Sequence, residues 1–265
     1  MAATGSDTVS VVERTRPIEI DGGIVGAHFL GRTAAFVLGE EAIVLAPPDG
    51  EPRRVGAHGG AILATVADDR RVITAGDDGK IVATDAQGAS SVLASDPKHR
   101  WIDHVALGPD GVVAWSAGKT AYVKARELRE FEAPSTVGGL AFFPKGLRLA
   151  IAHYNGATLW FPNAAGASQL VLWPFQGKDG PMGKTPRLLT PSGHRVDIVA
   201  CHPGTDVVAA GYNNGLLLLA RIEDGAEILA KKPGDAAVTA LAWSGDGRLL
   251  AWGTENGEAG IVNVG

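Results

Sequence analysis

The sequence is short of thiols, long apolar runs and clustered positive charge. Among 265 residues it contains one cysteine, Cys201, which excludes an internal disulfide and a zinc site built from several thiolates of one chain. No run approaches 18 apolar residues, and Lys and Arg occur at most two or three together. The sequence therefore predicts neither a membrane span nor a nucleic-acid partner. Residues 1–20 lack the basic and apolar parts of a signal peptide, so we expect a cytoplasmic protein.

Segments with a helical period of 3.6 residues are also missing. Instead, 36 Gly and 15 Pro separate short runs rich in Val, Ile, Leu and Ala, a pattern typical of an all-β chain. With 45% apolar residues, 20% charged residues and a net charge of −5, the composition is that of an ordinary soluble domain that can bury a core. The Ala, Gly and Val content leads us to expect a bacterial source.

One pattern recurs six times: apolar, two free positions, apolar, small, large apolar, then a turn. The copies start at Ile24, Ala61, Ile102, Val137, Val196 and Val238. A second apolar run, an Asp-Gly or Asn-Gly turn and a third run follow most copies, which predicts antiparallel meanders. The intervals are 37, 41, 35, 59 and 42 residues, and four of them lie near the length of a four-stranded propeller blade, about 40–45 residues.

Short motifs within these units resemble the WD-repeat family of β-propellers. Gly193 and His194 precede the fifth inner strand as a Gly-His pair, and Asp78 stands in a second-to-third-strand turn. The segment from Gly56 to His58 is a looser version of the Gly-His pair. The resemblance covers about Ile24 to Gly265. It implies four-stranded antiparallel blades, with His194 hydrogen-bonded inside its own blade.

The family's Trp-Asp signature is incomplete. Asp85 ends one third strand where the Trp-Asp pair would stand, and only Trp160 and Trp173 supply a Trp at that place, neither followed by Asp. The sequence thus predicts a propeller with degenerate repeats.

The two ends of the chain are predicted to meet in one blade. The last unit stops after its third strand, while Val11–Ile20 reads as a strand without a neighbour of its own. We expect this run to pair beside Ala259–Val264 and to protect the sheet edge. Residues 1–10 then form a tail, and residues 11–265 form a single propeller domain.

Residues 163–192 break the regular cycle. Two strand-like runs ending in Trp follow each other within Ala157–Gly177, inside the 59-residue interval. Residues 169–175 are either the fourth strand of their unit, followed by a loop, or the third strand of a further blade whose first two strands were deleted. The first alternative gives six blades, and the second gives seven with one incomplete. Sequence leaves open whether a deletion is natural or engineered.

Few residues suggest chemistry. The seven histidines show no spacing typical of a compact metal site, and no nucleophile elbow or phosphate loop is present. Asp103 and Asp197 share the second position of their units, and His104 adjoins the first. A resemblance to lactonase-type propellers would imply a metal near the channel at these three residues. The competing interpretation is that Arg100 or Arg195, or backbone N–H groups, satisfy both carboxylates. Cys201 takes the slot of a large apolar residue and is predicted to be buried.

The remaining candidates lie in loops. Loops that enter inner strands and loops that join second to third strands gather on one face of a propeller, the upper loop face. Its predicted binding residues are Arg100, Trp101, Tyr154, Asn155, Arg195, Tyr212, Asn213 and Glu255. Trp, Tyr and Arg dominate binding hot spots, although the two tyrosines could instead pack between blades. We therefore predict a non-catalytic, monomeric interaction scaffold with a protein partner of unknown identity and no cofactor. The alternative is a metal-dependent propeller.

Overall fold

The structure is a computed structural model that describes residues 9–132, 136–142, 149–153, 170–172, 187–189 and 194–265. These residues form strands and two 3-10 turns, η1 (Val12–Arg14) and η2 (Pro109–Gly111), with no α-helix among them. The predicted all-β class is confirmed. The chain divides into two compact units, residues 20–160 and residues 1–19 with 161–265.

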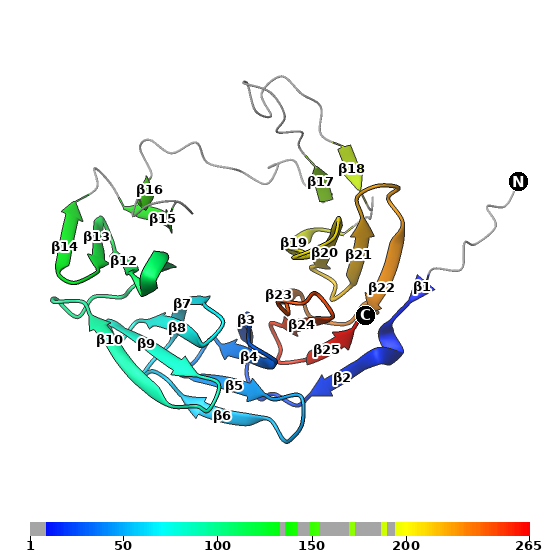
Figure 1. Ribbon diagram of the computed structural model, residues 1–265, viewed down its shortest axis with the longest axis horizontal. Coiled ribbons are helices and arrows are strands. Elements are labelled where there is room, and N and C mark those ends of the chain that lie inside the picture. The colour runs from blue at the N-terminus through cyan, green and yellow to red at the C-terminus, as the bar shows by residue number, and fades with distance from the viewer. Residues whose placement is uncertain (1–8, 133–135, 143–148, 154–169, 173–186, 190–193) are drawn as a thin grey trace, which may run out of the picture. The chain divides into compact units, whose positions relative to one another are not determined.

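The unit of residues 20–160 contains three four-stranded antiparallel sheets and one pair of strands (Figure 1). The first sheet holds β3 (Ile24–Leu30), β4 (Thr33–Leu38), β5 (Ala42–Ala46) and β6 (Arg53–Gly56). The second holds β7 (Ile62–Ala67), β8 (Arg71–Gly76), β9 (Lys80–Asp85) and β10 (Ser90–Ser95). The third holds β11 (His104–Leu107), β12 (Val113–Ala117), β13 (Thr120–Lys124) and β14 (Leu128–Glu132). The pair consists of β15 (Val137–Phe142) and β16 (Leu149–His153). Each sheet follows chain order, as the meander pattern predicts.

The other unit contains two larger sheets. One holds β19 (Val196–Cys201), β20 (Val207–Tyr212), β21 (Leu217–Arg221) and β22 (Glu227–Lys231), with β1 (Val9–Ser10) parallel to β22 as a fifth strand. The other holds β23 (Val238–Trp243), β24 (Leu249–Thr254), β25 (Ala259–Asn263) and β2 (Thr15–Ile18). β2 pairs antiparallel with β25, joining Thr15 to Val262 and Ile18 to Ala259. The predicted pairing of the chain ends is confirmed.

The N-terminal segment reaches further than the sequence predicts. Residues 9 and 10 were assigned to a tail, but they form β1, and the Val11 N–H donates to the Leu229 carbonyl at 2.9 Å. The Val11 side chain is buried among residues of both sheets, including Leu219 and Trp252. This segment therefore contacts two sheets in succession.

The irregular region contributes a separate pair of strands. β17 (Leu170–Leu172) and β18 (Arg187–Leu189) pair antiparallel with each other, and their neighbours in the chain, like Trp160 and Trp173, lie outside the described residues. Residues 187–189 thus form a strand rather than part of a loop. The rest of the irregular region, on which the count of six or seven blades depends, lies outside the described residues.

A register shift near the start of the inner strand recurs in β3, β7, β15, β19 and β23. In each, the second residue of the unit is the extra, bulged one, as Leu63 is between Ile62 and Ala64. Ile62 therefore occupies the first position, so the predicted start at Ala61 is wrong by one residue. Because side chains alternate along a strand, Thr65 and Ala67 replace Ala64 and Val66 in the fourth and sixth positions.

Apolar clusters between neighbouring sheets form the core. Between the sheets of β7 and β11, for example, Ile73, Ile81, Ile102, Trp115 and Tyr122 are all buried. Alternation sends the odd and even residues of each strand to opposite neighbours, so both faces of a sheet are apolar. Cys201 departs from this pattern. Its side chain is exposed, and the prediction that it is buried is wrong.

Candidate functional site

Asp96 organises the loop that enters β11. Its residue is 1% exposed, and its carboxylate accepts the backbone N–H groups of Lys98 and Arg100, each at 3.0 Å. The Arg100 Nη2 donates to Asp96 Oδ1 at 2.8 Å. Burial opposes ionisation, but the bonds from Arg100 and from the backbone outweigh it and lower the pKa of Asp96. His99 at the tip has a φ of 52°, a conformation that this network holds in place.

Arg100 ties this loop to the following sheet. Its guanidinium donates to the Ala117 carbonyl at 3.2 Å, to Thr120 Oγ1 at 3.1 Å and to the Tyr122 hydroxyl at 2.8 Å. The ring of Tyr122 stacks on Trp115 with centroids 5.3 Å apart. The sequence offered Arg100 as a contact residue or as the partner of Asp103. Its donors are instead committed to Asp96 and to the sheet, although a third of its side chain remains exposed.

Trp101 follows directly and is the most exposed large apolar residue of the described chain, at 65%. The next residue, Ile102, is fully buried, and its N–H donates to the Gly76 carbonyl at 3.2 Å. The backbone of Trp101 is thus fixed on both sides while its indole faces solvent. A rigid aromatic side chain loses little entropy on binding, which is the property of a binding anchor.

In the other unit, predicted loop residues close small rings with the strand entry. The Arg195 N–H donates to Asn213 Oδ1 at 2.9 Å, and the Asn213 N–H donates back to the Arg195 carbonyl at 2.8 Å. Ala237 and Glu255 repeat this exchange at 3.1 Å in both directions. Asn213 and Glu255 are exposed, but their side chains first serve to join two loops.

Three predicted residues need correction or lie outside the described residues. Tyr212 is fully buried beside Val208, Ala210 and Leu218, so the packing interpretation holds and its ring does not lie on the upper loop face. Tyr154 and Asn155 lie outside the described residues.

The alternative metal residues are engaged by other groups of the chain. Asp103 Oδ2 accepts the Gly118 N–H at 3.2 Å, and His104 Nε2 donates to the Val137 carbonyl at 3.2 Å. Asp197 pairs with Arg195, as the sequence predicts. The described part of the chain holds no group of three His, Cys, Asp or Glu side chains able to bind a metal ion.

A buried triad resembles a catalytic one but is structural. His58 Nδ1 lies 3.0 Å from Asp78 Oδ1, and His58 Nε2 lies 2.8 Å from Thr74 Oγ1. Thr74 is fully buried, and its hydroxyl donates to the Val82 carbonyl at 3.4 Å, so no substrate can reach it. The bond from His58 and two backbone N–H groups outweigh burial and lower the pKa of Asp78. The looser Gly56–His58 motif therefore makes this link, whereas His194 is exposed.

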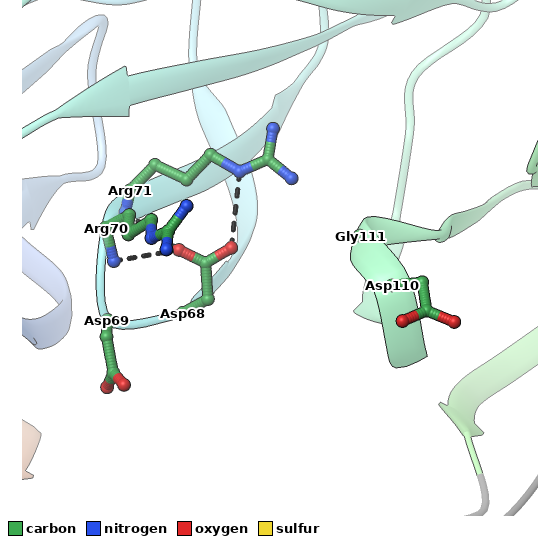
Figure 2. A pocket seen from close by; sticks show the side chains of 6 residues that line it. All are labelled: Asp68, Asp69, Arg70, Arg71, Asp110 and Gly111. Carbon is green, nitrogen blue, oxygen red and sulfur yellow. Dashed lines mark hydrogen bonds and ion pairs between the residues drawn. The ribbon is translucent and has the colours of Figure 1, made fainter.

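A shallow cleft lies at the opposite ends of β7 and β11. The loop joining β7 to β8 and the turn η2 enclose about 560 Å³, and Figure 2 shows Asp68 joined to Arg71 across the first loop. Asp68 also accepts the N–H groups of Arg70 and Arg71, each at 2.9 Å. These contacts outweigh burial and lower the pKa of Asp68. Both loops read only as turns in the sequence, which gives no sign of this cleft. Within the cleft, Asp68 and Arg71 pair with each other and close their loop.

Comparisons with known proteins agree with this fold. Residues 199–265 match the family model described as the anaphase-promoting complex subunit 4 WD40 domain. Among 1458 solved chains that match, the WD40 beta propeller domain of Doa1 has a TM-score of 0.63 at 12% identity, covering 94% of this chain and 96% of that one. No curated protein matches the sequence. The fold is that of a WD40 β-propeller, and the family-model match over residues 199–265 agrees with the WD-repeat motifs.

Proposed function

We propose that this chain is a non-catalytic scaffold that binds a protein partner through its upper loop face, with Trp101 as the anchor. The observation that carries the proposal is the contrast around Trp101. Asp96 and Arg100 lock its loop with a network of hydrogen bonds, yet the indole itself is 65% exposed. Large aromatic side chains in rigid surroundings contribute much of the free energy of protein–protein binding.

The other candidate polar groups support a non-catalytic role. The His58 triad is closed to solvent at Thr74, and in the cleft Asp68 is paired with Arg71 of its own loop. WD40 propellers commonly act as interaction scaffolds, although a fold alone does not assign a function. No specific observation favours the metal-dependent alternative over this one.

The remaining parts of the proposal concern setting and assembly. No helix in the described residues is long and apolar enough to cross a membrane. We infer a monomer in the bacterial cytoplasm that binds a protein and no nucleic acid, consistent with the net charge of −5.

The test compares three forms of the purified chain in pull-downs from a bacterial lysate: wild type, Trp101→Ala and Phe131→Ala. Phe131 is a matched control because it is an exposed aromatic residue of the same unit, located on the outer strand β14. We expect one protein to be captured by wild type and Phe131→Ala, with at least tenfold less captured by Trp101→Ala. The metal content of each sample is measured by mass spectrometry.

Equal capture by all three forms would refute the role of Trp101. One metal ion bound per chain, lost on Asp103→Asn, together with no captured protein, would replace the scaffold proposal with the metal-dependent one.

A further inference from the structure

Leu63 is an exposed apolar side chain at the upper end of β7. It is the bulged residue of this strand, left out of the ladder between Ile62 and Ala64, and it is 42% exposed. Ile62, its neighbour in the chain, is buried at 3%. A bulge re-aims a side chain while the strand on either side of it stays paired. Leu63 is therefore held at a fixed backbone position without belonging to the core.

The turn that joins β8 to β9 lies between Leu63 and Trp101. The Asp77 N–H in this turn donates to the Ala61 carbonyl at 3.0 Å, in the loop that enters β7. The Ile102 N–H, in the segment that enters β11, donates to the carbonyl of the residue before Asp77 at 3.2 Å. Leu63 and Trp101 stand within two residues of these bonds. Backbone hydrogen bonds thus fix the two exposed side chains on either side of one turn.

Two carboxylates beside these side chains have no partner. The Asp77 carboxylate lies over Gly60, where an added Cβ would collide with it. Glu41 follows Glu40, whose carbonyl accepts the Ile62 N–H at 2.9 Å, so it stands next to the same strand entry. Among the described residues, the carboxylates of Asp77 and Glu41 accept no hydrogen bond and form no ion pair.

The Lys and Arg side chains of these upper loops stand beside other carboxylates. The ion pairs are Arg54–Glu40, Lys80–Asp78, Arg100–Asp96 and Lys119–Glu132. Lys98 shares Glu132 with Lys119: the hydrogen bond and charge of Lys119, and then the charge of Lys98, lower the pKa of Glu132. The charges of Asp77 and Glu41 are therefore not neutralised by these cations, so this part of the face favours a cationic ligand.

We propose that the surface formed by Glu41, Leu63, Asp77 and Trp101, the strand-entry surface, binds a protein segment in which Lys or Arg stands next to a bulky apolar residue. This inference rests on the proposed function and names the chemistry of its partner. The apolar residue packs on Leu63 and the Trp101 indole, while the cationic side chain pairs with Asp77 and Glu41. A cationic group also stacks favourably on an indole, the aromatic ring that attracts cations most strongly. An acidic segment is disfavoured, because like charges at a contact raise the free energy of the complex.

The probe is a random dodecapeptide library displayed on phage and selected on the immobilised full chain. Enriched peptides are synthesised, and their dissociation constants are measured for wild type and variants. Asp77→Asn/Glu41→Gln removes both unpaired charges and breaks no side-chain hydrogen bond among the described residues. Asp49→Asn/Glu51→Gln is the matched control, because it removes two exposed charges from the loop that joins β5 to β6, at the opposite end of β5 from Glu41.

We expect the enriched peptides to carry more Lys and Arg than the unselected library, next to Trp, Phe, Leu or Ile. Asp77→Asn/Glu41→Gln and Leu63→Ser should each weaken binding by about fivefold or more. The control double variant should bind as wild type does. Raising the NaCl concentration from about 50 mM to about 500 mM should weaken binding to wild type more than binding to Asp77→Asn/Glu41→Gln.

Three results would overturn the inference: enriched peptides without an excess of Lys and Arg, equal effects of the two double variants, or a selection that enriches no peptide. The Trp101→Ala variant separates this inference from the scaffold proposal. Binding lost on Trp101→Ala but unchanged by Asp77→Asn/Glu41→Gln would keep the scaffold and reject the basic partner. Binding lost on Asp77→Asn/Glu41→Gln but unchanged by Trp101→Ala would support the basic partner and reject Trp101 as the anchor.

Discussion

Replacing Arg100 with alanine is the sharpest test of how the structure holds its exposed tryptophan. The change removes the Nε and Nη2 donors that lie 3.1 and 2.8 Å from the Asp96 carboxylate, and it leaves the buried Tyr122 hydroxyl without its partner. Breaking a buried pair from one side costs about 3–5 kcal/mol. Asp96 keeps two backbone N–H donors, and the guanidinium is one-third exposed. We therefore expect the low end, a loss of about 3 kcal/mol in the free energy of unfolding.

The assay is urea unfolding at pH 7, followed by tryptophan fluorescence and by far-UV circular dichroism. Arg195→Ala is the matched control, since it also removes an Arg–Asp pair but from a largely exposed site, and it should leave the unfolding midpoint nearly unchanged. The double variant Asp96→Ala/Arg100→Ala should lose less than the sum of the two single variants, because it leaves no orphaned charge.

The pH dependence of stability provides a second test of the same pair. The pKa of Asp96 is lowered in the folded chain, so its contribution is present above the unfolded value of about 3.9 and disappears as the pH falls through the folded value. The difference between wild type and Arg100→Ala should shrink over that range. A loss below about 1 kcal/mol at pH 7, or a difference that does not change in acid, would contradict the role assigned to this pair.

Three further changes probe other contacts. Burial lowers the pKa of His28 to about 4. Wild type should therefore lose stability as the pH falls from about 6.5 to 4, and His28→Gln should not. Equal acid sensitivity of the two proteins in urea unfolding would disprove this. His202 Nε2 donates to the Gly247 carbonyl at 3.1 Å, and its ring packs on Trp243. His202→Ala should therefore lower the melting temperature and shift the tryptophan emission to the red. An unchanged emission spectrum would argue against this packing. Gly79 has a φ of 71°, and a Cβ at this position would stand 3.0 Å from the Arg100 carbonyl oxygen. Gly79→Ala should therefore lower the free energy of unfolding, measured with urea, by about 2 kcal/mol. An unchanged free energy of unfolding would show that the turn is unstrained.

Pattern alone predicted the all-β class, the six inner strands and the pairing of β2 with β25, because alternation and turn residues are local signals. It misplaced the β7 unit by one residue. A bulge follows Ile62, and sequence does not show which residue leaves the ladder. It placed Trp101 and Asn213 in exposed loops, but it did not find the bonding of the Asp96 carboxylate. That network depends on the Tyr122 hydroxyl and the Thr120 side chain, which only the folded sheet brings near Arg100.

The binding interpretation of Tyr212 and the predicted burial of Cys201 were wrong for opposite reasons. Both were judged from their own positions in the repeat, where a turn tyrosine is expected outside and a sixth-position residue inside. Their burial depends instead on what covers the sheet. Tyr212 belongs to a buried cluster with Val208 and Leu218, while the side chain of Cys201 is exposed. Local sequence does not show which residues will cover a given side chain.

The pairing of β2 with β25 also sets the order of events during synthesis. Thr15 leaves the ribosome 247 residues before Val262, the residue that it pairs with. At about 5–20 residues per second, the N-terminal strand waits roughly 10–50 s before its partner exists. During that interval Val11 and Ile18, both buried in the finished protein, have no core to enter. The sheet of β23–β25 and β2 can therefore assemble only after β25 has been translated, and nascent chains stalled before β25 should be the forms that chaperones and proteases recognise first.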